Sequence, residues 1–330
     1  MGLVLVAGVA PAGATPPSSP PGLDQRDEAG GHGGGPPHLK VGAASRSVLP
    51  EVDGGRAYLD DGLPSDDDGT DPGVFVEGWD AGRIAVGNGE SDSHWVRDDL
   101  RVRATALEDP ESREITVLAS ADLYMIFSAD AEEIRQRAAQ LLPPGLADRT
   151  SITISTTHNH HGPDTAFDVN HEWYDEMAQQ TAATIAEAVM DRRPATLRVG
   201  DGEHWLGVAD GRDPMVIDPT LNALQATATN GEVIATLVQW NNHPETTLGW
   251  EPTADLSDDC DALDEGEDCS AEGRYFTADF PGAMSRWIES EVGGEALFFN
   301  GAVGGLTTPL GALVWEVTDE VGLGNHYDPP

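Results

Sequence analysis

The chain has 330 residues, of which 39% are hydrophobic and 23% are charged. This is enough for one large domain or two medium domains with a hydrophobic core. Its formal net charge is −40, and a surface this acidic repels nucleic acid and anionic membranes, so both are poor partners.

The first 39 residues are interpreted as a signal-like segment followed by a disordered linker rich in Pro and Gly. A short apolar run followed by the small-residue stretch AGA resembles a secretory signal without its basic start, and the alternative is a disordered apolar tail. The signal-like segment leads us to expect a secreted protein. No other segment approaches the roughly 20 apolar residues of a membrane span, so we expect no transmembrane segment. Residues 40–330 are expected to form one large domain that is incomplete at its C-terminal end.

Hydrophobic periodicity then predicts strands and helices in chain order. Strands are predicted at residues 98–109, 114–126, 150–158 and 196–208, followed by a hairpin over 221–244 that turns at Asn230 and Gly231. A final strand and loop are predicted over residues 295–305. Helices are predicted at residues 128–142, 170–193 and 279–292. This order indicates an α/β fold in which a mixed β-sheet forms the core and helices cover it.

The segment THNHHGP, residues 157–163, places three histidines in four positions directly after a predicted strand. If the strand continues through the motif, His158 and His160 point the same way because side chains alternate along a strand. Two imidazoles on one face at a strand end can converge on one metal ion. The alternative is a structural cluster in which the histidines hydrogen-bond to loop carbonyls.

A second histidine lies where another predicted strand meets a loop, because His243 ends the hairpin and precedes Pro244. On its own, a histidine before a proline is better explained as a capped loop histidine. A zinc site needs more than two ligands, however, so metal binding by His243 is favoured when it is considered together with the first motif.

The segment STTHNHHGP, residues 155–163, resembles the TH-x-H-x-GP block of the neutral/alkaline (non-lysosomal) ceramidase family. The resemblance continues in the same order over residues 40–310. The further segments that carry it are VRDDLRVRATALED with ITVLASADLYMI, NNHPETTLG, FTADFPGAMSRWIE and FFNGAVGGLTTP.

This resemblance implies a secreted zinc-dependent amidohydrolase that cleaves the amide bond of ceramide or a related N-acyl lipid. It implies that His158 and His243 are zinc ligands and that His160 lies beside the metal, where it orients or protonates the amide. Arg212 matches an arginine near the catalytic site of the family. Zinc would activate a water molecule, and the zinc, His160 or Arg212 would stabilise the oxyanion.

The sequence departs from the family in its ligands. The family's remaining zinc ligands, a Glu and a Tyr, come from a later part of the chain that is not found here. Asp122, Glu245 or Asp279 could replace them, although the two aspartates could instead hydrogen-bond to the ligand histidines. The alternatives are therefore a hydrolase of another class on this scaffold, acting on an ester or another N-acyl substrate, or a non-catalytic fragment with an incomplete metal site.

The two cysteines, Cys260 and Cys269, lie in the acidic segment CDALDEGEDC. In an exported protein this spacing favours a small disulfide loop, and the alternative is two free thiols on a surface loop.

Overall fold

In this computed structural model, the described part of the chain is residues 39–50, 98–167, 169–205, 213–214, 216–246 and 275–303, together with several two-residue strands. These strands are β2 (Val74–Phe75), β3 (Ala85–Val86), β4 (Ser91–Asp92), β5 (Trp95–Val96), β10 (Ala209–Asp210), β13 (Tyr275–Phe276), β15 (Leu306–Thr307), β16 (Trp315–Glu316) and β17 (Gly324–Asn325). The signal-like segment, both cysteines and Arg212 lie outside the described residues. The described helices include none that is long and apolar enough to cross a membrane.

Eight strands form one sheet in the order β14-β12-β11-β9-β1-β6-β7-β8. The strands are β1 (Lys40–Ser47), β6 (Arg101–Glu108), β7 (Ile115–Ala121), β8 (Thr150–Thr156), β9 (Arg193–Glu203), β11 (Thr220–Ala228), β12 (Val233–Trp240) and β14 (Glu295–Asn300). The β7–β8 and β12–β14 pairs are parallel and the other pairs are antiparallel. The predicted mixed sheet is therefore confirmed.

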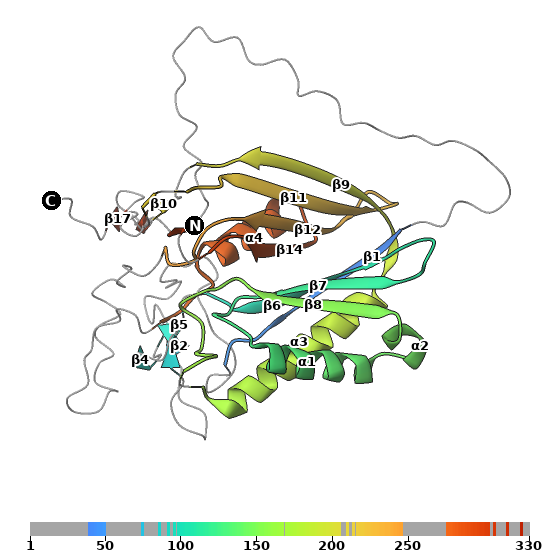
Figure 1. Cartoon of the computed structure of the whole chain (residues 1–330), viewed down its shortest axis with the longest axis horizontal. Coiled ribbons are helices and arrows are strands. Elements are labelled where there is room, and N and C mark those ends of the chain that lie inside the picture. Colours follow the sequence, from blue (N-terminus) through green and yellow to red (C-terminus); the bar gives the residue numbers. More distant parts are fainter. Residues whose placement is uncertain are drawn as a thin grey trace, which may run out of the picture.

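The sheet folds back on itself as two half-sheets, β1-β6-β7-β8 and β9-β11-β12-β14, which lie one above the other (Figure 1). The pairing of β1 with β9, which joins the two half-sheets, is short and has two paired positions. Leu237 and Leu297 from the second half-sheet pack with Ala43 and Leu118 from the first. This apolar layer between the half-sheets holds the strand ends of both halves close together.

Helices cover the outer faces of the half-sheets, as the sequence predicts. They are α1 (Ser128–Leu141), α2 (Pro144–Ala147), α3 (His171–Met190) and α4 (Asp279–Glu291). Ile134 of α1 and Ile185 of α3 pack on the first half-sheet around Val117. Ile288 of α4 packs on the second half-sheet against Val238, whose side chain points away from that of the neighbouring Leu237.

Several strand boundaries differ from the prediction, and three of these differences have a local cause. β7 ends at Ala121 because the Leu123 amide turns back to the Ala121 carbonyl at 2.8 Å. β8 ends at Thr156, and His158 two residues later has a positive φ of 64°, which no strand accommodates. β9 covers residues 193–203 rather than 196–208, since its first residues pair with β1.

Candidate metal centre

His158, His160 and His243 converge at one point beyond the ends of β8 and β12. One ring nitrogen from each lies within 4.8 Å of the others, and the ring centroids are 4.7–4.9 Å apart. The sequence predicted that these residues meet, but β8 ends before the motif, so alternation along a strand is not what brings them together. The histidines instead follow a turn, and the left-handed backbone of His158 redirects the chain.

Tyr124, which follows β7, fixes the orientation of His158. The Nδ1 of His158 donates a hydrogen bond to the Tyr124 carbonyl at 3.1 Å. The Tyr124 ring stacks on His158 at a centroid distance of 4.8 Å and meets His160 edge-on at 4.7 Å. Because Nδ1 carries the proton, Nε2 of His158 keeps its lone pair for a metal. Nothing in the sequence pattern had identified Tyr124.

The other two histidines face each other directly, although 83 residues separate them. The Nε2 atoms of His160 and His243 are 2.8 Å apart. The Glu245 carboxylate lies beside both, with Oε1 at 3.6 Å from Nε2 of His160 and 3.4 Å from Nε2 of His243. Four side chains that can bind a metal therefore gather at this strand end.

Buried amide side chains hold the backbone around the histidines. Asn159 donates to the Thr277 carbonyl at 2.6 Å and so connects the motif to the segment that leads into α4. Asn300, the last residue of β14, donates to the Thr157 carbonyl, just before His158. The Asn300 bond crosses from one half-sheet to the other, so the histidine positions depend on the packing of both.

The imidazoles are kept neutral by their surroundings. Burial, and then the neighbouring histidines, lower the pKa of His160 to about 3. Burial is also the main cause that lowers the pKa of His158, ahead of its proximity to His243. Metal ligation requires neutral imidazole, so both rings are in the protonation state that a metal needs at pH 7.

The three acidic candidates have different environments. Asp122 does not lie with the histidines, because its Oδ2 accepts from Nη1 of Arg103 at 2.9 Å and from the Arg101 amide at 3.1 Å. Asp279 is buried, with a positive φ of 50°, and its charge raises the pKa of Glu245 after the larger effect of burial. The Glu245 carboxylate contacts the Nε2 atoms of His160 and His243.

This donor set suits zinc. Three imidazoles are a common protein ligand set of catalytic zinc sites, and zinc accepts a carboxylate oxygen as well. Nitrogens bound at 2.0–2.1 Å in tetrahedral geometry lie about 3.3 Å apart. The observed separation of 2.8 Å between Nε2 of His160 and Nε2 of His243 therefore needs a small side-chain movement. The function expected of Arg212 remains a prediction.

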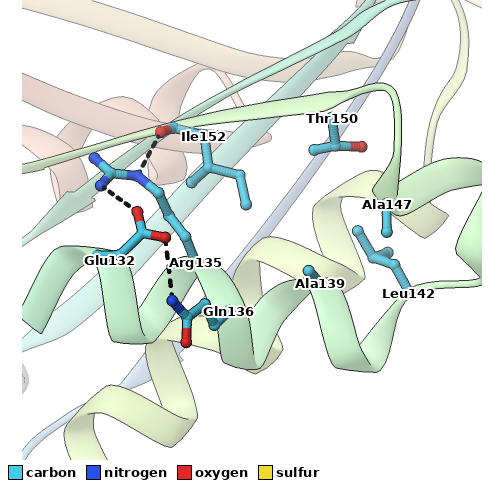
Figure 2. Close-up of a pocket in the computed structure, with 8 residues that line it drawn as sticks. All are labelled: Glu132, Arg135, Gln136, Ala139, Leu142, Ala147, Thr150 and Ile152. Atoms are coloured by element: carbon cyan, nitrogen blue, oxygen red, sulfur yellow. Dashed lines mark hydrogen bonds and ion pairs between the residues drawn. The ribbon is translucent and has the colours of Figure 1, made fainter.

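Two described cavities lie away from the histidines. One, of about 240 Å³, lies between α1 and β8 and is crossed by Arg135, which donates to the Ile152 carbonyl (Figure 2). The other, of about 440 Å³, is lined mainly by residues 231–234 and 292–295 at the opposite end of β12. Neither cavity includes a residue of the candidate centre.

Comparison with known proteins identifies the fold. No family model and no curated protein matches the sequence. A structure of neutral ceramidase from Pseudomonas aeruginosa matches with a TM-score of 0.60 at 16% identity over 88% of this chain. A structure entitled "Ceramidase complexed with C2" matches with a TM-score of 0.57 at 17% identity over 82% of this chain. The chain therefore has a divergent ceramidase-like fold.

The matches cover 41% and 39% of those two structures. The chain thus spans about two fifths of the length of the ceramidase structures that it matches. At this level of identity the likeness concerns the fold.

Proposed function

We propose that this chain is a secreted zinc-dependent hydrolase that cleaves the amide bond of ceramide or a related N-acyl lipid. The observation that carries the proposal is the convergence of His158, His160 and His243 within 4.8 Å. The fold similarity to neutral ceramidases supports the substrate class, and the signal-like segment at residues 1–39 supports secretion.

His158 and His243 are proposed as zinc ligands, as the resemblance implies. The resemblance gives His160 a different part, that of orienting or protonating the amide. Because Nε2 of His160 lies 2.8 Å from Nε2 of His243, both nitrogens face the same point. We therefore propose His160 as a third ligand, and the zinc content of a His160→Ala variant distinguishes the two roles.

Zinc bound at this point would lower the pKa of a coordinated water to about 7 and polarise a substrate carbonyl. The protein's own contribution is to hold the ligands in place. The Tyr124 carbonyl keeps the Nδ1 proton on His158, and burial keeps His160 neutral. Arg212 remains the proposed partner of the oxyanion, since such a charge needs a positive group nearby.

An exposed aromatic residue beside the centre supports a lipid substrate. Phe167 is 69% exposed, and its ring centroid is 6.4 Å from that of Tyr124, which contacts both His158 and His160. A single exposed apolar side chain is common on protein surfaces, so the support comes from its position beside the centre. We propose that Phe167 contacts the acyl chain.

Metal content and hydrolysis test this proposal in the purified chain and in His158→Ala and His243→Ala variants, with His171→Ala as the control. His171 is an exposed residue at the start of α3. About one zinc per chain is expected in the wild type and the control, with loss in both centre variants.

Hydrolysis is measured on matched lipids that carry the same acyl chain in amide or ester linkage. Amide cleavage that depends on zinc supports the proposal. Zinc with cleavage of the ester alone indicates a hydrolase of another class. Absence of zinc from the wild type would overturn the proposal and leave a structural histidine cluster.

A further inference from the structure

Glu245 is placed beside the histidines by a tight turn of the backbone. The Glu245 amide donates to the His243 carbonyl at 2.9 Å, across the intervening Pro244. This bond folds the chain so that the side chains of His243 and Glu245 come to the same side. Proline at the centre fixes its own φ, which limits the alternatives to this turn.

The distances among three ligand atoms are close to those around a zinc ion, with the shortest below the tetrahedral value. Nε2 of His160, Nε2 of His243 and Oε1 of Glu245 form a triangle with sides of 2.8, 3.4 and 3.6 Å. A point equidistant from the three atoms lies about 1.9 Å from each in their plane, and a displacement of under about 1 Å from the plane gives zinc bond lengths of 2.0–2.1 Å. The carboxylate oxygen fits this triangle as well as the two nitrogens do.

Glu245 lies partly buried beside two of the histidines. Its side chain is 14% exposed, and its ion-pair contacts within the described ranges are to His160 and His243. Both distances are measured to Oε1, so one carboxylate oxygen lies beside both Nε2 atoms.

We propose that Glu245 is a further protein ligand of the zinc site formed by His158, His160 and His243. This inference rests on the proposed function. It departs from the family resemblance, which places the acidic ligand in a later part of the chain. Four protein ligands would fill the usual tetrahedral coordination of zinc, so a water molecule would enter by expansion to five ligands, which some catalytic zinc sites use.

Zinc affinity tests this inference. The metal-free full chain is titrated with Zn²⁺ in competition with a chromophoric chelator, for the wild type, Glu245→Gln, Glu245→Asp and a control, Glu295→Gln. Glu295 is a partly buried glutamate at the start of β14, outside the centre. We expect Glu245→Gln to weaken zinc affinity at least 10-fold, Glu245→Asp to weaken it less, and the control to match the wild type.

The visible spectrum of the Co²⁺-loaded protein gives a second readout that does not depend on activity. We expect a different spectrum for Glu245→Gln than for the wild type, because an oxygen ligand is lost. An unchanged spectrum together with zinc affinity within twofold of the wild type would overturn the Glu245 assignment and leave the proposed hydrolase intact. A wild type that binds no zinc would instead remove the proposed function itself.

Discussion

Replacing Asp122 with Asn tests whether this aspartate supports the fold rather than binding the metal. Asp122 was a candidate ligand from its sequence, but its carboxylate binds Arg103 in the interior, where both side chains are 4% exposed. Arg103 also contacts Glu289 of α4 at 2.9 Å. The substitution keeps the shape of the side chain and removes its charge.

The expected cost follows from these contacts. Breaking a buried ion pair by removing one partner costs about 3–5 kcal/mol, because the remaining charge is left without compensation. Glu289 is 25% exposed and still neutralises Arg103, so we expect a loss near the lower end, about 3 kcal/mol. For a domain of 150–250 residues this corresponds to a fall in Tm of about 6–12 °C.

Urea unfolding followed by tryptophan fluorescence, to which the buried Trp173 contributes, measures the loss of stability. Zinc titration of the folded variant measures binding. We expect unchanged zinc affinity despite lower stability. Glu289→Gln serves as a comparison and is expected to cost less than Asp122→Asn, because Glu289 is partly exposed. A loss below about 1 kcal/mol would refute the argument from burial, and a loss of zinc without a loss of stability would restore Asp122 as a ligand.

Three other substitutions probe the fold. Gly42→Ala should cost about 2–3 kcal/mol in urea unfolding, because the new Cβ would lie 2.3 Å from the Ala188 carbonyl oxygen of α3; an unchanged midpoint would contradict this contact. Asn170→Ala should cost about 1 kcal/mol by removing the N-cap of α3, which circular dichroism during thermal unfolding measures. Burial tends to raise the pKa of the Glu108 carboxyl, but Arg192 and other cations outweigh it and hold that pKa below its usual value. The stabilisation by Glu108 is therefore present at neutral pH and lost as the pH falls below about 4.5, so Glu108→Gln should lose stability relative to the wild type at pH 7 and approach it near pH 3.

Periodicity predicted most elements because they bury one face in a regular pattern. Helix α3 and the β11–β12 hairpin appear close to their predicted bounds, since a capping Asn170 and the turn at Asn230 and Gly231 mark them locally. Strand β1 was not predicted, because its sequence KVGAASRS has small residues in place of a clear alternation. Small residues are used there because α3 crosses Gly42 closely.

The candidate centre was predictable in part. The motif around His158 and the His243 position are visible as histidines at strand ends, and the structure brings them together. Tyr124 and the pairing of Asp122 with Arg103 were not visible, because both depend on which segments meet in the folded chain. Glu245 was a candidate ligand from the sequence, but the turn that places its side chain beside His243 depends on a backbone hydrogen bond that the sequence does not predict.

The seam between the half-sheets gives the candidate centre a consequence for stability. His158 and His160 belong to one side of the seam, and His243 and Glu245 belong to the other, while β1 and β9 join the two sides through two residue pairs. An ion bound by residues of both sides would link the two half-sheets. Because such an ion binds the folded chain and not the unfolded one, it would raise the free energy of unfolding of both halves together.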